Sequence, residues 1–293
     1  QMLRAEKPDL VHIITPPSAR VELMTLVSDL GVPGCIVEKP VAWQVSDWRA
    51  LAALEQNTQT RFGVGAQFRY HPNLTDCRNA LASGRLGQTL FVEASAGLNI
   101  CDQGVHTLDW AMSLLGDPAP VRIFGQVGGA DQLHGRHPAP NDALAEVWFA
   151  NGVRMLWTLG AAAPRIGGHP ETYKHCRVAA YAENGYASFE EFGRWLIHTP
   201  EGEQTGLSED PADSVESNGA AQLGLTRAMI AWLAGGEPVG TNLGRALQQW
   251  NAILGLYASA LWRRPVELPF DPPDDLWEWL VAALDPAING GVR

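Results

Sequence analysis

The chain has 293 residues, 46% of them hydrophobic and 18% charged, which is enough for about two globular domains and excludes a chain that is disordered throughout. Its 32 acidic residues outnumber its 21 Lys and Arg residues, giving a formal net charge of -11 without a basic patch, so the sequence argues against nucleic-acid binding. No apolar run approaches the ~20 residues that span a bilayer, so we expect no membrane segment.

The four cysteines are widely spaced and form no C-x-x-C pair, and residues 1–7 are polar and mixed in charge, unlike a signal peptide. This pattern predicts reduced thiols in a cytoplasmic protein. The cysteines are Cys35, Cys77, Cys101 and Cys176.

Three short apolar strands alternate with two helices in the first 70 residues. The strands are predicted at residues 9–14, 34–37 and 60–66, and the helices at residues 18–30 and 46–56. Strands that alternate with helices at this spacing predict βαβ units and a parallel sheet.

The pattern changes after residue 70. Four helices are predicted, at residues 72–83, 103–115, 218–233 and 243–262. Strands are predicted at residues 89–96, 121–127, 145–149, 154–159, 177–182, 187–189 and 195–198. Asn-Gly pairs between strands favour hairpins, and the acidic stretch 200–217 is predicted to be a mobile loop. The fold class is therefore α/β, with a small parallel-sheet domain over residues 1–70 and an α+β domain with a large, mostly antiparallel open sheet over residues 71–293.

The ends of the first two strands are candidate ligand-binding segments, because open parallel sheets bind ligands at the carboxyl ends of their strands. These ends are Thr15-Pro16-Pro17 and Glu38-Lys39-Pro40. Lys39 directly follows a buried strand, so its ammonium group can point into a cleft and bind a hydroxyl or carbonyl oxygen. The alternative is a solvated lysine paired with Glu38.

A second candidate cluster lies on the predicted helix 103–115 and just before it. Asp102 and His106 are four residues apart, which places them on one helix face and predicts a carboxylate–imidazole pair for proton transfer. The alternative is that Asp102 only caps the helix and His106 is only a polar helix residue. The spacing of Cys101, Asp102 and His106 is poor for a metal, and we expect no metal site.

Two further patterns are weak evidence for a functional site. The H-x-x-H pair His134 and His137 lies in a Gly/Pro-rich stretch and is predicted to be a solvated loop. The segment 63–68 begins like a dinucleotide-binding fingerprint but lacks the third glycine.

The motifs also occur together in a set order. The two strand ends are followed by the segment 67–70, then by Asp102-x-Gly104-x-His106-x-x-Asp109, and by Arg263-Arg264-Pro265 near the end. In this order they resemble the Gfo/Idh/MocA family of nicotinamide-dependent oxidoreductases, over nearly the whole chain.

The resemblance implies a Rossmann domain for NAD or NADP and a second domain that holds the substrate and forms homodimers or homotetramers through its sheet. It implies hydride transfer between the cofactor and a secondary alcohol or ketone of a sugar or polyol. His106 would be the general base, Asp102 would orient His106 or the substrate, and Lys39 would bind the reacting oxygen. The implied cofactor-binding residues are Thr15, Pro16, Pro17, Glu38, Lys39 and Gln67.

Two departures from the family stand out. Family members often carry a His where Arg20 stands. The chain also begins without the first strand, Gly-rich turn and helix of a Rossmann domain, an opening of ~50–70 residues that binds the pyrophosphate. We therefore expect the 293-residue chain to bind NAD(P) weakly or not at all.

Two other functions stay open at this point. One is a glycosidase of the same family that oxidises its substrate transiently with tightly held NAD. The other is a non-catalytic regulator that binds a sugar or nucleotide, although the joint presence of Lys39, Asp102 and His106 favours an enzyme. The sequence names neither the sugar nor the choice between NAD and NADP.

Overall fold

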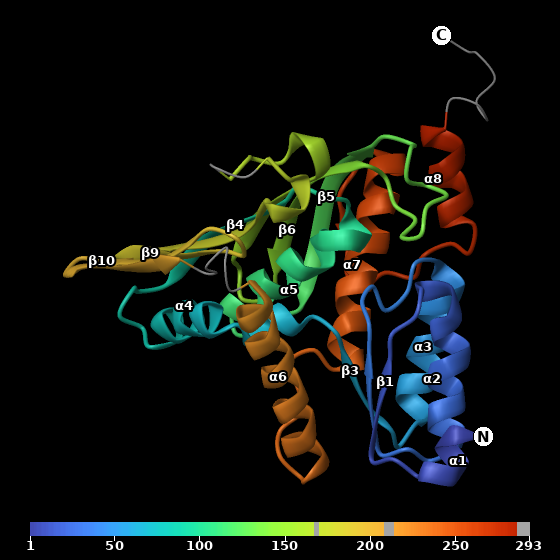
Figure 1. The fold of residues 1–293 in the computed structure, drawn as a ribbon. Helices are drawn as coiled ribbons and strands as arrows, with labels where there is room; N and C mark the ends of the chain where they lie inside the picture. The colour runs from blue at the N-terminus through green and yellow to red at the C-terminus, as the bar shows by residue number, and fades with distance from the viewer. Residues whose placement is uncertain (167–169, 208–213, 286–293) are drawn as a thin grey trace.

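The computed structural model describes residues 1–166, 170–207 and 214–285. Two sheets lie on either side of one long helix, α7 (Leu243–Trp262) (Figure 1). This helix packs against the large sheet on one side, and against β3 and α3 of the smaller sheet layer on the other. It therefore joins the two predicted halves of the chain. The division at residue 70 itself stays a prediction.

The smaller sheet is parallel, as predicted, in the order β1-β2-β3. Its strands are β1 (Leu10–Ile13), β2 (Gly34–Val37) and β3 (Arg61–Val64). The helices between them are α2 (Arg20–Asp29) and α3 (Val45–Asn57), and α1 (Met2–Glu6) precedes β1. Because neighbouring strands run parallel and in register, their carboxyl ends lie along one edge.

The larger sheet has nine strands in the order β11-β10-β9-β8-β4-β7-β6-β5-β12. All neighbours are antiparallel except β4 and β7, which confirms the prediction of a mostly antiparallel sheet. The first five strands are β4 (Thr89–Ala96), β5 (Pro120–Gly128), β6 (Asp142–Phe149), β7 (Arg154–Leu159) and β8 (Cys176–Ala182). The remaining strands are β9 (Gly185–Glu190), β10 (Arg194–Thr199), β11 (Gly202–Leu207) and β12 (Val266–Glu267).

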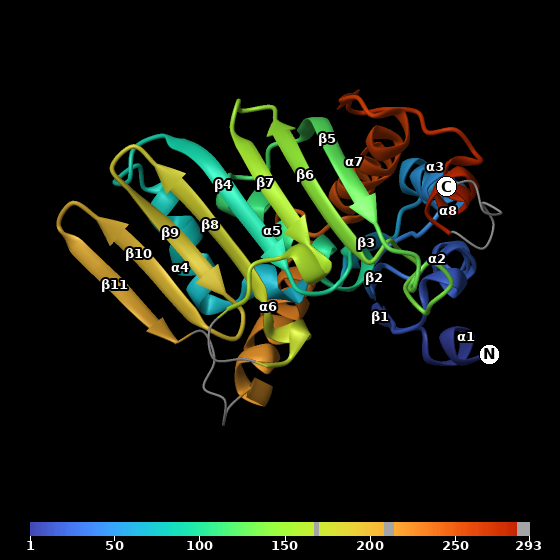
Figure 2. The same cartoon turned by 90° about the horizontal axis from the view of Figure 1, so that it is seen from above.

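Helices cover one face of the large sheet: α4 (Pro72–Ala82), α5 (Val105–Leu114) and α7 (Figure 1). In Figure 2 the sheet is seen from the opposite side, and its strands lie open to the viewer. The two faces differ because successive side chains along a strand point to opposite faces of the sheet, so one face can be packed under helices while the other stays exposed. On β6, for example, Ala143, Ala145 and Val147 are buried, whereas Leu144 is 51% exposed.

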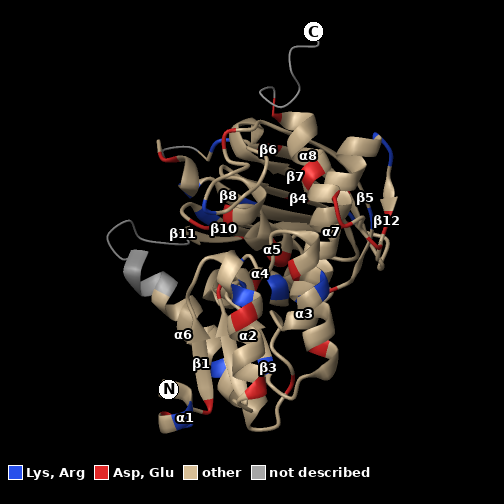
Figure 3. Ribbon diagram, turned by 90° about the vertical axis from the view of Figure 1, so that its right-hand side faces the viewer, with Lys and Arg blue, Asp and Glu red and all other residues tan. Residues whose placement is uncertain are grey.

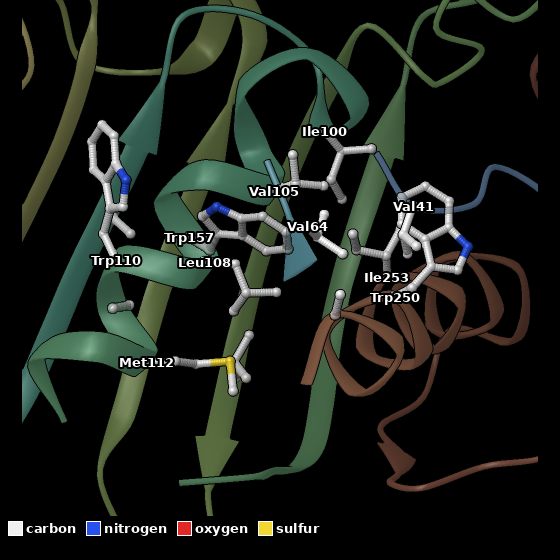
Figure 4. Packing of buried hydrophobic residues seen from close by; sticks show 14 of the residues in the cluster. Val41, Val64, Ile100, Val105, Leu108, Trp110, Met112, Trp157, Trp250 and Ile253 are labelled. Carbon is white, nitrogen blue, oxygen red and sulfur yellow. The ribbon is translucent and has the colours of Figure 1, made fainter. Parts of the chain in front are cut away.

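The core under the sheet is continuous with the core around α7. Trp110, Trp157 and Trp250 are at most 1% exposed. Figure 4 shows Val64 from β3 and Val105 from α5 close to Trp250 and Ile253 of α7. All four are buried members of one hydrophobic cluster. This packing brings the carboxyl end of β3 against the start of α5.

Several elements differ from the predictions. Residues 202–207 form β11, not a loop, and residues 208–213 of that predicted loop lie outside the described residues. β11 was missed because it is an edge strand whose residues are mostly exposed, so it lacks an apolar pattern. Helices α1 and α8 (Leu276–Leu284) were also not predicted, and α6 (Ser214–Leu233) begins before the predicted start at 218.

Lys and Arg residues are interspersed with Asp and Glu residues on the side of the molecule shown in Figure 3. Within the described residues, no helix combines the length and apolar character needed to cross a membrane.

Candidate active site

The carboxyl edge of the parallel sheet brings together residues from three separate parts of the sequence. Thr15 lies just beyond β1, Lys39 just beyond β2 and Gln67 just beyond β3. Thr15 Oγ1 and Gln67 Oε1 are buried and have no hydrogen-bond partner among the described residues. Buried polar atoms are normally paired, so these two atoms are suited to contact a polar ligand. Of the other implied cofactor residues, Pro16 is exposed, Pro17 is buried and Glu38 is half-buried.

Arg20 ties the first two strand ends together. Its guanidinium Nη2 donates to the backbone oxygens of Thr15 at 2.8 Å and Lys39 at 2.9 Å. Burial lowers the pKa of Arg20 to about 10, against the opposing effect of Glu38. Its Nε and Nη1 atoms are buried and lack partners among the described residues. Arg20 therefore holds the ends of β1 and β2 together.

Lys39 is half-buried at the centre of this edge. Its ammonium Nζ donates a hydrogen bond to the backbone oxygen of Asp102, 63 residues further along the chain. Burial lowers the pKa of Lys39, while the charges of Asp102 and Glu38 act in the opposite direction. The alternative of a solvated lysine paired only with Glu38 is therefore wrong.

His106 lies in the first turn of α5, beside Lys39. Its side chain is 6% exposed and packs edge-to-face against Phe68, with 5.5 Å between the ring centroids. Burial lowers the pKa of His106 well below 6.5, and the nearby charge of Lys39 lowers it further. The imidazole is therefore neutral near pH 7, and its Nδ1 atom has no partner among the described residues. A neutral imidazole in this position can accept a proton.

The residues before α5 form a π-helical turn (Ile100–Gly104), not the first turn of an α-helix. Asn99 caps this turn, accepting hydrogen bonds from the backbone amides of Cys101 and Asp102. A π turn is wider than an α turn, so residues four apart no longer lie one above the other. Such turns occur frequently at functional sites.

This turn corrects the expected Asp102–His106 pair. Asp102 Oδ1 instead contacts Nδ1 of His137, and no hydrogen bond between Asp102 and His106 occurs among the described residues. The prediction that the His134–His137 loop is solvated is also wrong for His137, which is 21% exposed on its side chain, but holds for His134, which is 70% exposed. Sequence spacing gave no signal for a contact across 35 positions.

A buried ion pair fixes the helix that carries His106. Arg69 donates from Nε and Nη2 to the two carboxylate oxygens of Asp109, at 2.9 and 2.8 Å. Gln249 of α7 donates to the same carboxylate at 2.8 Å, and Arg69 also binds Asp117 beyond the end of α5. Both Arg69 and Asp109 are at most 2% exposed. The pair therefore locks α5 to the segment that follows β3.

A cavity of about 20 Å³ is lined by Lys39 together with Val105, Gln249, Trp250 and their neighbours. It is large enough for about one water molecule. Across the described ranges, no group of three or more His, Cys, Asp or Glu side chains is placed to hold a metal ion.

The burial of His106 has a consequence for stability below neutral pH. Because the folded protein resists protonating this ring, the unfolded chain binds more protons below pH 6.5. Above pH 6.5 the burial of His106 does not reduce the free energy of unfolding. As the pH falls below 6.5, the free energy of unfolding decreases by up to about 1.4 kcal/mol per pH unit.

Denaturant unfolding near pH 7.5 and near pH 5.5 measures this slope. We expect the slope to be shallower in His106→Gln than in wild type. His134→Gln, which removes an exposed imidazole, is the matched control. Equal slopes in His106→Gln and wild type would contradict the assignment.

Comparison with known proteins is consistent with this geometry. Residues 1–66 match the model of an oxidoreductase family with an NAD-binding Rossmann fold, GFO_IDH_MocA. D-apiose dehydrogenase from Paraburkholderia graminis is 27% identical over 152 residues, which is 44% of this chain and 40% of that protein. The aligned part thus spans less than half the length of this curated relative.

Solved structures share the fold. An oxidoreductase from Agrobacterium radiobacter, in complex with NAD+, L-tartaric acid and magnesium, aligns with a TM-score of 0.71 at 19% identity, over 88% of this chain and 80% of its own. An inositol dehydrogenase homolog from Azotobacter vinelandii, complexed with NADH and myo-inositol, has a TM-score of 0.68 at 14% identity, over 89% of this chain and 78% of its own. Residues 1–66 are therefore similar to the NAD-binding part of the GFO_IDH_MocA oxidoreductase family, and the chain as a whole shares its fold with these solved oxidoreductase structures.

Proposed function

We propose that the protein transfers a hydride between a nicotinamide cofactor and a secondary alcohol or ketone of a sugar or polyol. The observation that carries this proposal is the bond from the Lys39 ammonium group, at the carboxyl edge of the parallel sheet, to the backbone of Asp102, four residues before the buried His106 ring, whose pKa the charge of Lys39 lowers. An alcohol dehydrogenation needs a donor for the reacting oxygen and an acceptor for its proton, and these two groups supply both. The dehydrogenase relatives support the same reaction class.

The residues at this edge fit a nicotinamide dinucleotide. Thr15, Pro16, Pro17, Glu38, Lys39 and Gln67 are the proposed cofactor-binding residues. The unpartnered oxygens of Thr15 and Gln67 and the unpartnered donors of Arg20 offer polar contacts to it. When bound, the nicotinamide supplies the hydride acceptor or donor. The choice between NAD and NADP stays open.

The proposed roles of the side chains follow from their surroundings. In the oxidation direction, the substrate hydroxyl gives its proton to His106, while the hydride leaves from the carbon. Lys39 uses its two remaining N–H groups to bind the reacting oxygen and stabilise its developing negative charge. Asp102, which does not contact His106, is assigned the other predicted role, orientation of the substrate hydroxyls.

A turnover assay on the protein in the form that its gene encodes tests this proposal. A panel of sugars and polyols is incubated with saturating NAD+ or NADP+, and reduced nicotinamide is followed by its absorbance. We expect net reduction of the nicotinamide cofactor with at least one polyol or sugar. Glycoside hydrolysis without net reduction would support the glycosidase instead. Binding of a sugar or nucleotide without either reaction would support a regulator.

The assembly and cellular location are further parts of the proposal. The open face of the large sheet exposes Phe124, Leu144 and Leu156, and an apolar sheet face of this kind suits a homodimer or homotetramer. The four cysteines are free and buried, which fits a reducing compartment such as the cytoplasm.

A further inference from the structure

The segment between β5 and β6, residues 129–141, is anchored over the π turn that carries Asp102. Leu133 and Ala139 are at most 1% exposed and hold the segment in the core. His137 lies between these two anchors in the sequence, and its side chain is 21% exposed. Its position is therefore fixed by buried neighbours on both sides.

Three side-chain contacts join this segment to the π turn. They are Asn99 Nδ2 to Gln132 Oε1, Cys101 Sγ to the backbone oxygen of Pro138 at 3.3 Å, and Asp102 Oδ1 to His137 Nδ1. The segment thus contacts three of the four residues from 99 to 102. These contacts hold the segment against the turn at three positions.

Asp102 is held in two separate ways. Its backbone is fixed by Asn99, which accepts from its amide, and by Lys39, which donates to its carbonyl oxygen. Its carboxylate is held by His137. Since the side chain of Asp102 is 30% exposed, it would be free to change rotamer without that contact.

We propose that His137 is a positioning residue that fixes the Asp102 carboxylate for substrate orientation. This inference rests on the proposed dehydrogenase function. His137 acts through Asp102 and does not itself contact the reacting atoms. Orientation by such a partner matters because a small misplacement of a positioning group lowers the rate strongly.

His137→Ala removes the contact. Because a hydrogen bond to a charged group is stronger than one between neutral groups, we expect a roughly 10- to 100-fold loss in kcat/KM. In His137→Asn the side-chain amide nitrogen stands where Nδ1 stood, so we expect most of this loss to be restored. His134→Ala, in the same segment but exposed, is the control and should keep wild-type kcat/KM.

Coupling to Asp102 separates positioning from a general structural role. The double variant Asp102→Asn/His137→Ala should lose no more turnover than Asp102→Asn alone. Additive losses, or no rescue by Asn, would overturn the positioning role. In the folded protein without ligand, the nitrogen NMR signals of the His137 ring should shift in Asp102→Asn, and those of His134 should not.

The outcomes also distinguish the two proposals. No turnover by the wild type on any substrate would overturn the proposed function, and the positioning role with it. Full activity of His137→Ala in an active enzyme would overturn only the positioning role. Ring signals of His137 that are unchanged in Asp102→Asn would show that the pair does not form, and would overturn it as well.

Discussion

Asp109→Ala is expected to lower the free energy of unfolding by about 3–5 kcal/mol, the usual cost of removing one partner from a buried ion pair. Asp109 accepts from Arg69 at two oxygens and from Gln249 at one of them, and the carboxylate is 1% exposed. Its removal leaves the guanidinium of Arg69 buried with only Asp117 to balance it. Urea denaturation of both proteins measures the difference.

Glu146→Ala is the matched control, because Glu146 pairs with Arg154 on the surface of the large sheet at 3.1 Å. Exposed pairs contribute about 0–1 kcal/mol, so we expect little change. If Asp109→Ala were no more destabilising than Glu146→Ala, the buried network would not be holding α5 in place.

His106→Ala is expected to lower turnover by about 10²–10⁴-fold, the usual contribution of a positioned acid–base group, while cofactor affinity stays near wild type. The ring is buried beside Lys39 and neutral near pH 7, so it is ready to accept the hydroxyl proton. Steady-state kinetics give the turnover, and equilibrium dialysis gives the cofactor affinity.

His198→Ala provides the control for this variant. His198 lies on β10, exposed and paired with Glu203 at 3.0 Å, near the far edge of the large sheet. We expect wild-type turnover from it. Unchanged turnover in His106→Ala would remove His106 from the mechanism, and a parallel loss of cofactor binding would point to a structural role instead.

The parallel sheet could be predicted because its strands carry a local signal. Each is a short apolar run, and two of the three end at prolines. The hairpin β8–β9 was likewise predictable, since Asn184-Gly185 lies where the turn is, with Ala182 opposite Gly185. Helix α8 follows a Pro-rich segment and was not predicted.

The candidate site was predicted only in part. Lys39 and His106 follow from a strand end and a motif, and in the structure Lys39 binds the backbone oxygen of Asp102, four residues before His106. The His137 contact could not be predicted, because it joins residues 35 positions apart through a π turn that no propensity indicates. The Arg69–Asp109 pair joins residues 40 apart and was missed for the same reason.

A crystal structure of the protein with a bound cofactor and a polyol that it oxidises tests the central claim most directly. We predict one hydroxyl oxygen within hydrogen-bonding reach, about 2.6–3.2 Å, of both Lys39 Nζ and a ring nitrogen of His106. A polyol bound in that complex with its hydroxyl groups away from both side chains would contradict the account.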